Sequence, residues 1–195
     1  MMVRARIIET GAAVPDRIVG NEELARLTGI SAGSIRRRTG ILERRWAAAG
    51  EATADLATRA GMQALDRAGE RPEDLGAIIV STTSPDTPLP STACHVQRLL
   101  GARHASAFDL SASCSGFLYA LSVGEQMIGA GHARRVLVVA AEVKSRFLNF
   151  KEGQTAILFG DGAGVWTRMQ AAYDTWQAER KEDVSKIPTI RAKAA

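Results

Sequence analysis

The chain has 195 residues, 46% hydrophobic and 24% charged, which is ordinary for a soluble globular protein large enough to bury a core. Its formal net charge of +4 is too mild to favour nucleic-acid binding, and its two cysteines are too few for a disulfide scaffold. The N-terminal stretch lacks the apolar region of a signal peptide, and no stretch reaches the roughly 20 apolar residues of a membrane span. We therefore expect a cytoplasmic protein with reduced thiols.

The predicted elements alternate between strands and helices along the chain. A first strand over 3–14 is followed by a short helix that Gly29 closes and by a second helix that Ser31 caps. A longer helix opens at Thr53 and stops at Gly69, with apolar residues on one face. The elements predicted further on are strands at 75–80, 105–110 and 134–141, helices at 91–100 and 115–130, and an antiparallel pair of strands at 156–159 and 163–169.

Strands that alternate with helices indicate an α/β fold with a largely parallel sheet. The helix at 115–130 is apolar on most faces, as expected of a helix buried on all sides. The run FGDGAG at 159–164 predicts a tight turn, because it lacks the G-x-x-x-x-G-K-[ST] pattern of a phosphate loop. Towards the C-terminus the sequence becomes polar, with mixed charge. We expect one domain over 1–168 and a poorly ordered or aberrant tail over 169–195.

The segment FDLSASCSGFLYAL at 108–121 places Cys114 where a predicted strand gives way to a predicted helix. At the start of a helix, free backbone N–H groups and the positive end of the dipole favour a thiolate, and they could hold the oxyanion formed when a thioester is attacked. Small neighbouring residues leave room for a substrate to reach the sulfur. The alternative is a buried, inert cysteine, a description that fits Cys94 inside its predicted helix.

Five stretches of the sequence, collinear and correctly spaced, resemble the N-terminal half of β-ketoacyl-acyl carrier protein synthase III and its relatives in the thiolase superfamily. They are RTGILERRWA (38–47), STTSPDTPLPSTACHVQRLLG (81–101), AFDLSASCSGFLYALSVGEQMI (107–128), VLVVAAEV (136–143) and TAILFGDGAGV (155–165). The resemblance covers residues 3–167. It implies a thiolase-like, five-layer αβαβα fold made of two similar halves, of which this chain is the N-terminal one, working as a homodimer.

The resemblance also implies a reaction. The family takes an acyl group from a CoA thioester onto a cysteine, which aligns with Cys114, and condenses it with malonyl-acyl carrier protein in fatty acid or polyketide biosynthesis. Arg38 aligns with an arginine that contacts the CoA nucleotide. Leu89 aligns with a loop residue that helps shape the acyl pocket of the other subunit, and Phe159 with a pocket-lining residue. The implied partners are acyl-CoA, as substrate, and acyl carrier protein. No cofactor is expected, and no cluster has metal-ligand spacing.

Two positions depart from the family's pattern. Ser34 stands where the family has a tryptophan, and Gly153-Gln154 stands in place of an arginine. In the family these two side chains sandwich the adenine of CoA, so their loss suggests a divergent branch without that clamp. The arginine-rich run at 36–45 suits CoA phosphates or an acidic carrier protein, or else forms a solvated helix and turn.

The family's condensation machinery includes a histidine and an asparagine in the C-terminal half, and none of His95, His104 and His132 aligns with that histidine. After Val165 the sequence departs from the family, which suggests a truncated or frame-shifted gene product. A half-molecule would expose the apolar face that normally packs on the second half. The alternative function is therefore a non-catalytic remnant, or an interaction subunit that pairs with a complete synthase or a separate C-terminal half.

Overall fold

The computed structural model describes residues 5–163. The predicted tail at 169–195, the predicted boundary at 168 and nearly all of the predicted strand at 163–169 lie outside these residues. The strands are β1 (Arg17–Gly20), β2 (Glu43–Trp46), β3 (Ala77–Ser81), β4 (Ser106–Leu110), β5 (Val136–Glu142) and β6 (Gly162–Ala163). The helices are α1 (Asn21–Thr28), α2 (Ala32–Thr39), α3 (Thr53–Ala68), α4 (Thr92–Leu100), α5 (Gly116–Gly129) and α6 (Gly153–Ala156), with short 3₁₀ turns η1 (Pro72–Asp74), η2 (Ser113–Ser115) and η3 (Ser145–Phe147).

The main sheet has the strand order β4-β3-β5-β6. Its central strand, β3, runs parallel to both neighbours, with Ile79 opposite Phe108 of β4 and Val138 of β5. Every residue of β3 is buried, as is usual for an apolar, β-branched strand inside a parallel sheet. At the far edge β6 pairs antiparallel with β5, where Ala163 lies opposite Ala141. The predicted α/β fold with a largely parallel sheet is confirmed.

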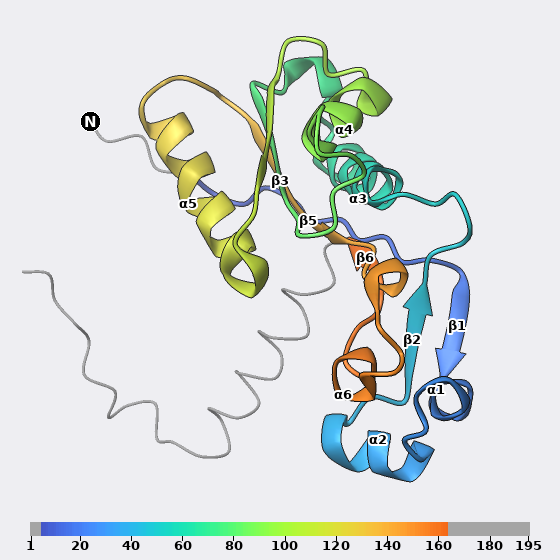
Figure 1. Cartoon of the computed structure of the whole chain (residues 1–195). Coiled ribbons are helices and arrows are strands. Elements are labelled where there is room, and N and C mark those ends of the chain that lie inside the picture. Colours follow the sequence, from blue (N-terminus) through green and yellow to red (C-terminus); the bar gives the residue numbers. More distant parts are fainter. Residues whose placement is uncertain (1–4, 164–195) are drawn as a thin grey trace, which may run out of the picture. The chain divides into compact units, whose positions relative to one another are not determined.

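Helices cover both faces of this sheet (Figure 1). On one face, Leu56 of α3 and Val96 of α4 share a hydrophobic core with Ile78 of β3 and other sheet residues. On the other face, α5 lies so close to β5 that a Cβ at Gly124 would be 3.3 Å from Val136 Cγ1. The small residue at this position therefore lets the helix backbone approach the sheet closely.

A second, smaller core joins β1 and β2 to α1, α2 and α6. The two strands pair antiparallel, with Arg17 opposite Trp46. This core buries Val19, Leu24, Ile35, Trp46 and Ile157. Nearby, the buried carboxylate of Asp161 accepts hydrogen bonds from the N–H of Ala47 at 2.7 Å and the N–H of Ser145 at 2.8 Å. The segments that leave β2 and β5 are thus tied to one side chain of the FGDGAG run.

The predicted first strand at 3–14 is wrong. Its described residues form no strand, and only Ala13 makes an isolated antiparallel bridge, to Ala163. Within the described part of the chain β6 has two residues, so it offers this segment a partner only at Ala13. The segment packs on α3 instead, where Gly11 lies directly against the backbone of Ala60.

The predicted strand at 156–159 is also wrong. Ala156 ends the short helix α6, and the neighbouring Ile157 is buried in the smaller core. β6 pairs with β5 and not with 156–159. The four-residue strands β1 and β2 were not predicted, because a run such as Glu43–Trp46 is short and largely charged.

The prediction that the helix over 115–130 is buried on all sides is wrong. α5 turns Gly116, Ala120 and Gly124 towards the interior, but Leu118 is 65% and Tyr119 is 56% exposed. An apolar face of α5 therefore remains uncovered by the residues that the structure describes. Over those same residues, no helix combines the length and apolar character that crossing a membrane requires.

The packing of the N-terminal segment on α3 predicts a large effect at Gly11. A Cβ added there would lie 2.1 Å from the carbonyl oxygen of Ala60 and 2.8 Å from the nitrogen of Ala64, both backbone atoms. We expect Gly11→Ala to lower the free energy of unfolding by about 1–3 kcal/mol in a urea titration. Gly33→Ala is the matched control, because its added Cβ meets only Arg37 Nη1 at 3.6 Å, and it should stabilise the exposed helix by about 0.5–1 kcal/mol. Equal stability of Gly11→Ala and the wild type would contradict this packing.

Candidate active site at Cys114

The parallel strands bring three chain segments to one edge of the sheet. Because β3, β4 and β5 run in the same direction, their last residues, Ser81, Leu110 and Glu142, lie towards the same end. Ligand sites of open α/β sheets form at this carboxyl end. Cys114 follows β4 at this end, as the sequence predicted.

Cys114 lies in η2, the 3₁₀ turn that leads directly into α5. The residue is exposed. Ser113, just before it, has a φ of +49°, a left-handed conformation that a residue with a side chain adopts at a cost in free energy. The N-cap of α5, Ser115, makes no side-chain capping hydrogen bond. The arrangement presents the thiol to solvent at the start of a helix, where backbone N–H groups favour negative charge.

Two contacts with the end of β3 fix this turn. The N–H of Thr82 donates to the carbonyl oxygen of Leu110 at 3.2 Å, so β4 stays attached to β3 up to the turn. On the other side of Cys114, Gly116 packs against Ser81, where an added Cβ would lie 2.2 Å from Ser81 Oγ. The turn that carries Cys114 is thus attached to the central strand both before and after the cysteine.

The second cysteine has a different environment. Cys94 is half-buried in α4, and its Sγ accepts a hydrogen bond from Ser91 Oγ at 3.3 Å. Its S–H points to the carbonyl oxygen of Ala107 at 3.7 Å. Cys94 therefore behaves as a packed residue between α4 and β4, in line with its interpretation from the sequence.

The loop between β3 and α4 contains Leu89. Leu89 is 86% exposed, and its peptide bond to Pro90 is cis. Thr87 Oγ1 donates to the carbonyl oxygen of Pro90 at 2.8 Å, and His95 Nε2 lies 3.1 Å from the same hydroxyl. Because the single hydroxyl proton goes to Pro90, the hydroxyl accepts from His95. His95 thus supports the loop that projects Leu89 into solvent.

Arg38 lies in the last turn of α2, exposed, and donates from Nη2 to Gln154 Oε1 at 2.6 Å. The neighbouring Gly153 packs closely on the connection between α1 and α2. A Cβ at Gly153 would lie 2.8 Å from Ile30 Cδ1 and 3.0 Å from Thr28 Cβ, so a side chain there would require these two residues to move. At 153–154, where the resemblance leads one to expect an arginine, the structure therefore has a closely packed glycine and a glutamine that accepts a hydrogen bond from Arg38.

Phe159 is half-buried and precedes Gly160. Gly160 packs on β2, where a Cβ added to Gly160 would lie 3.1 Å from Arg44 Cβ. No hydrogen bond among the described residues joins Cys114 to Arg38, Leu89 or Phe159. These four residues lie on separate elements, and no contact among the described residues joins them into one site.

Sequence reasoning missed three polar residues whose side chains form hydrogen bonds between distant segments of the chain: Asp161, Arg44 and Glu142. Arg44 is buried and donates to Asn21 Oδ1 at 2.9 Å and to the carbonyl oxygen of Ile157 at 3.0 Å. Burial lowers the pKa of the Arg44 guanidinium from its ordinary value. The signal for all three was weak, because their partners are far away in the sequence.

Comparison with known proteins agrees with the resemblance seen in the motifs. The family model for 3-oxoacyl-[acyl-carrier-protein] synthase III matches residues 108–175. A β-ketoacyl-[acyl-carrier-protein] synthase III of Caldanaerobacter subterraneus subsp. tengcongensis is 47% identical over 173 residues, which is 88% of this chain and 52% of that protein. Acetoacetyl CoA synthase NphT7 of Streptomyces sp. is 51% identical over 165 residues, 84% of this chain and 49% of that protein.

Solved structures give the same result for the fold. The 3-oxoacyl-[acyl-carrier-protein] synthase III of Aquifex aeolicus matches with a TM-score of 0.78 and 43% identity, over 81% of this chain and 51% of that one. The priming β-ketosynthase of the R1128 polyketide pathway matches with a TM-score of 0.79 and 34% identity, over 84% and 49%. The chain thus spans about half the length of the relatives it matches. In sequence and in fold, it corresponds to the N-terminal portion of β-ketoacyl-[acyl-carrier-protein] synthase III, the thiolase-like family that its motifs predicted.

Proposed function

We propose that Cys114 accepts an acyl group from an acyl-CoA thioester, as the first step of a ketoacyl synthase III reaction in fatty acid or polyketide biosynthesis. The observation that carries the proposal is the exposed thiol in the turn that opens α5. Relatives that bear the name of this synthase match the chain over this region. A reducing compartment such as the cytoplasm would keep this thiol free.

The proposed step is an acyl transfer from sulfur to sulfur. Cys114 loses its proton to solvent, and the thiolate attacks the carbonyl carbon of the CoA thioester. The resulting oxyanion lies near the start of α5, where backbone N–H groups stabilise negative charge. The bond between that carbon and the CoA sulfur then breaks, CoA leaves as a thiolate that takes a proton from solvent, and the acyl group remains on Cys114.

We propose three further substrate contacts. Arg38, exposed and turned to Gln154, would bind the phosphates of the CoA nucleotide. With Ser34 and Gly153-Gln154 in place of the family's tryptophan and arginine, phosphate binding would outweigh contact with the adenine ring. Leu89 would line the acyl pocket of a second subunit in a homodimer. Phe159 would line the acyl pocket of its own subunit.

Condensation with malonyl-acyl carrier protein is proposed to need a second segment that supplies the family's histidine and asparagine. A general acid or base typically contributes about 10²–10⁴-fold to a rate. The exposed Leu118 and Tyr119 on α5 support a partner at this face and a second candidate function, that of an interaction subunit. The partner would be a separate C-terminal half or a complete synthase.

The acyl acceptor can be identified by mass spectrometry. After incubation with acetyl-CoA, we expect the folded chain to gain one acetyl group that peptide mapping places on Cys114. Cys114→Ala should abolish the gain, whereas Cys94→Ala should retain it, because Cys94 is packed between α4 and β4. Absence of the adduct on folded wild-type protein, or its presence on Cys94, would contradict the proposal.

The partner face can be tested by co-expression with the C-terminal half of a related synthase. We expect the two polypeptides to co-purify and to form ketoacyl product together, and the chain alone to form none. Leu118→Lys should abolish co-purification, since it places a charge on the apolar face. Leu42→Lys is the control, as a leucine of similar exposure (61% against 65% for Leu118) outside α5, and should leave co-purification intact. Product formation by the purified chain alone would exclude the interaction-subunit function.

A further inference from the structure

We infer that Glu142 and Lys144 are positioning residues for Cys114, acting through the segment that leaves β3. The inference rests on the proposed function of Cys114 and adds two residues to its site. Glu142 ends β5, and Lys144 follows it at the carboxyl edge of the sheet. Their side chains are only 17% and 22% exposed, and Lys144 Nζ lies 3.5 Å from Glu142 Oε2.

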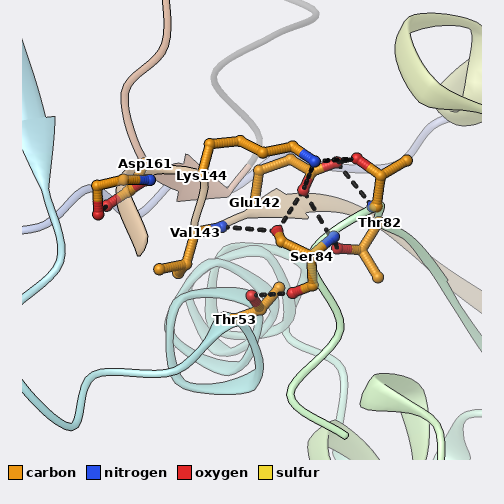
Figure 2. Close-up of polar contacts among 9 residues, drawn as sticks. Thr53, Thr82, Ser84, Glu142, Val143, Lys144 and Asp161 are labelled. Carbon is orange, nitrogen blue, oxygen red and sulfur yellow. Dashed lines mark hydrogen bonds and ion pairs between the residues drawn. The ribbon is translucent and has the colours of Figure 1, made fainter. Parts of the chain in front are cut away.

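Glu142 binds the segment after β3 through both carboxylate oxygens (Figure 2). Its Oε1 accepts from the N–H and the hydroxyl of Thr83, each at 2.8 Å. Its Oε2 accepts from the hydroxyl of Ser84, and from the hydroxyl of Thr82 at 3.4 Å. Lys144 Nζ donates to the hydroxyl of Thr83. Consecutive residues 82–84 are thus all attached to one carboxylate.

The hydrogen bonds of this network all run towards Glu142. Ser84 Oγ already accepts from the N–H of Val143 at 2.9 Å, so its proton is directed to Glu142. Thr83 Oγ1 already accepts from Lys144, which can only donate, so its proton is directed to Glu142 as well. Every group that faces Glu142 is therefore a donor. This set of donors suits a carboxylate, which only accepts, and Lys144 adds one more donor to the hydroxyl of Thr83.

The same segment holds the turn of Cys114. Thr82, which Glu142 binds by its hydroxyl, donates from its N–H to the carbonyl oxygen of Leu110 at 3.2 Å. Ser81, the residue before it, is the packing partner of Gly116. Thr82 and Ser84 are 3% and 2% exposed, so a loss of Glu142 would leave the protons of two buried hydroxyls without an acceptor. Residues 81–82 would then shift, and the turn between Leu110 and Gly116 would shift with them.

Substitutions of Glu142 and Lys144 test whether this pair holds the turn of Cys114. Glu142→Gln keeps the shape of the side chain but turns one acceptor into an amide donor, which meets hydroxyl or N–H donors in either orientation. Lys144→Met removes the charge, and Lys144→Arg retains it as the conservative variant. Asp74→Asn is the matched control, a carboxylate in the exposed pair with Arg71 on η1. All are compared with wild type in the full chain.

The experiment combines amide hydrogen exchange with acetyl transfer from acetyl-CoA. We expect Glu142→Gln to speed exchange about tenfold in peptides covering 81–86 and 111–116, with little change in α3, and to slow acetylation of Cys114 on the order of 10²-fold, as for a misplaced reacting group. Lys144→Met should show smaller effects in the same direction. Lys144→Arg and Asp74→Asn should resemble wild type.

Two results would overturn the inference. One is unchanged exchange over 111–116 in Glu142→Gln. The other is exchange that rises equally in α3, which would mean a general loss of stability. If wild-type Cys114 takes no acetyl group, the proposed function fails, yet exchange still decides whether Glu142 holds the turn.

Discussion

The structure depends on the burial of β3 between two parallel strands. Both edges of β3 are hydrogen-bonded, to β4 and to β5, and all of its residues are buried. This constraint fixes where the strands end. Ser81 at the end of β3 then supports α5 through Gly116, and Thr82 supports β4 through Leu110. Cys114 lies between β4 and α5, and the end of β3 supports both of these elements. The buried strand β3 therefore sets the position of Cys114, although Cys114 is not part of it.

Much of this architecture could be predicted from local sequence. The apolar runs of β3 and β5 indicated buried strands, and Gly69 and Gly101 end α3 and α4 in the left-handed conformation expected of C-cap glycines. The junction at Cys114 was visible because strand end, small residues and helix start coincide within a few positions. These signals are local, so a single sequence suffices to find them.

Features that depend on distant partners escaped prediction. Glu142 looks like an ordinary charged residue at the end of an apolar strand, since its partner Ser84 is 58 positions away. Likewise, residues 3–14 were predicted to form a strand, but a strand needs a neighbour along its length, and the described part of β6 provides one only at Ala13. The exposed face of α5 has the same origin: its apolar composition predicted burial, and what covers a helix is not encoded in the helix itself.

The segment at 153–154 packs closely on the connection between α1 and α2. A Cβ at Gly153 would lie 2.8 Å from Ile30 Cδ1 and 3.0 Å from Thr28 Cβ, and Gln154 Oε1 accepts a hydrogen bond from Arg38. A side chain at 153 would therefore require Ile30 and Thr28 to move.

The central claim is that the fold presents Cys114 as a reactive thiol while it packs Cys94 away. The most direct test is the pair of alkylation rates with iodoacetamide in the folded protein, read by peptide mass spectrometry with the unfolded chain as reference. For each cysteine, the rate in the folded protein is divided by its rate in the unfolded chain. The account predicts that this ratio is at least about tenfold higher for Cys114 than for Cys94. Equal rates for the two cysteines, or faster alkylation of Cys94, would contradict it.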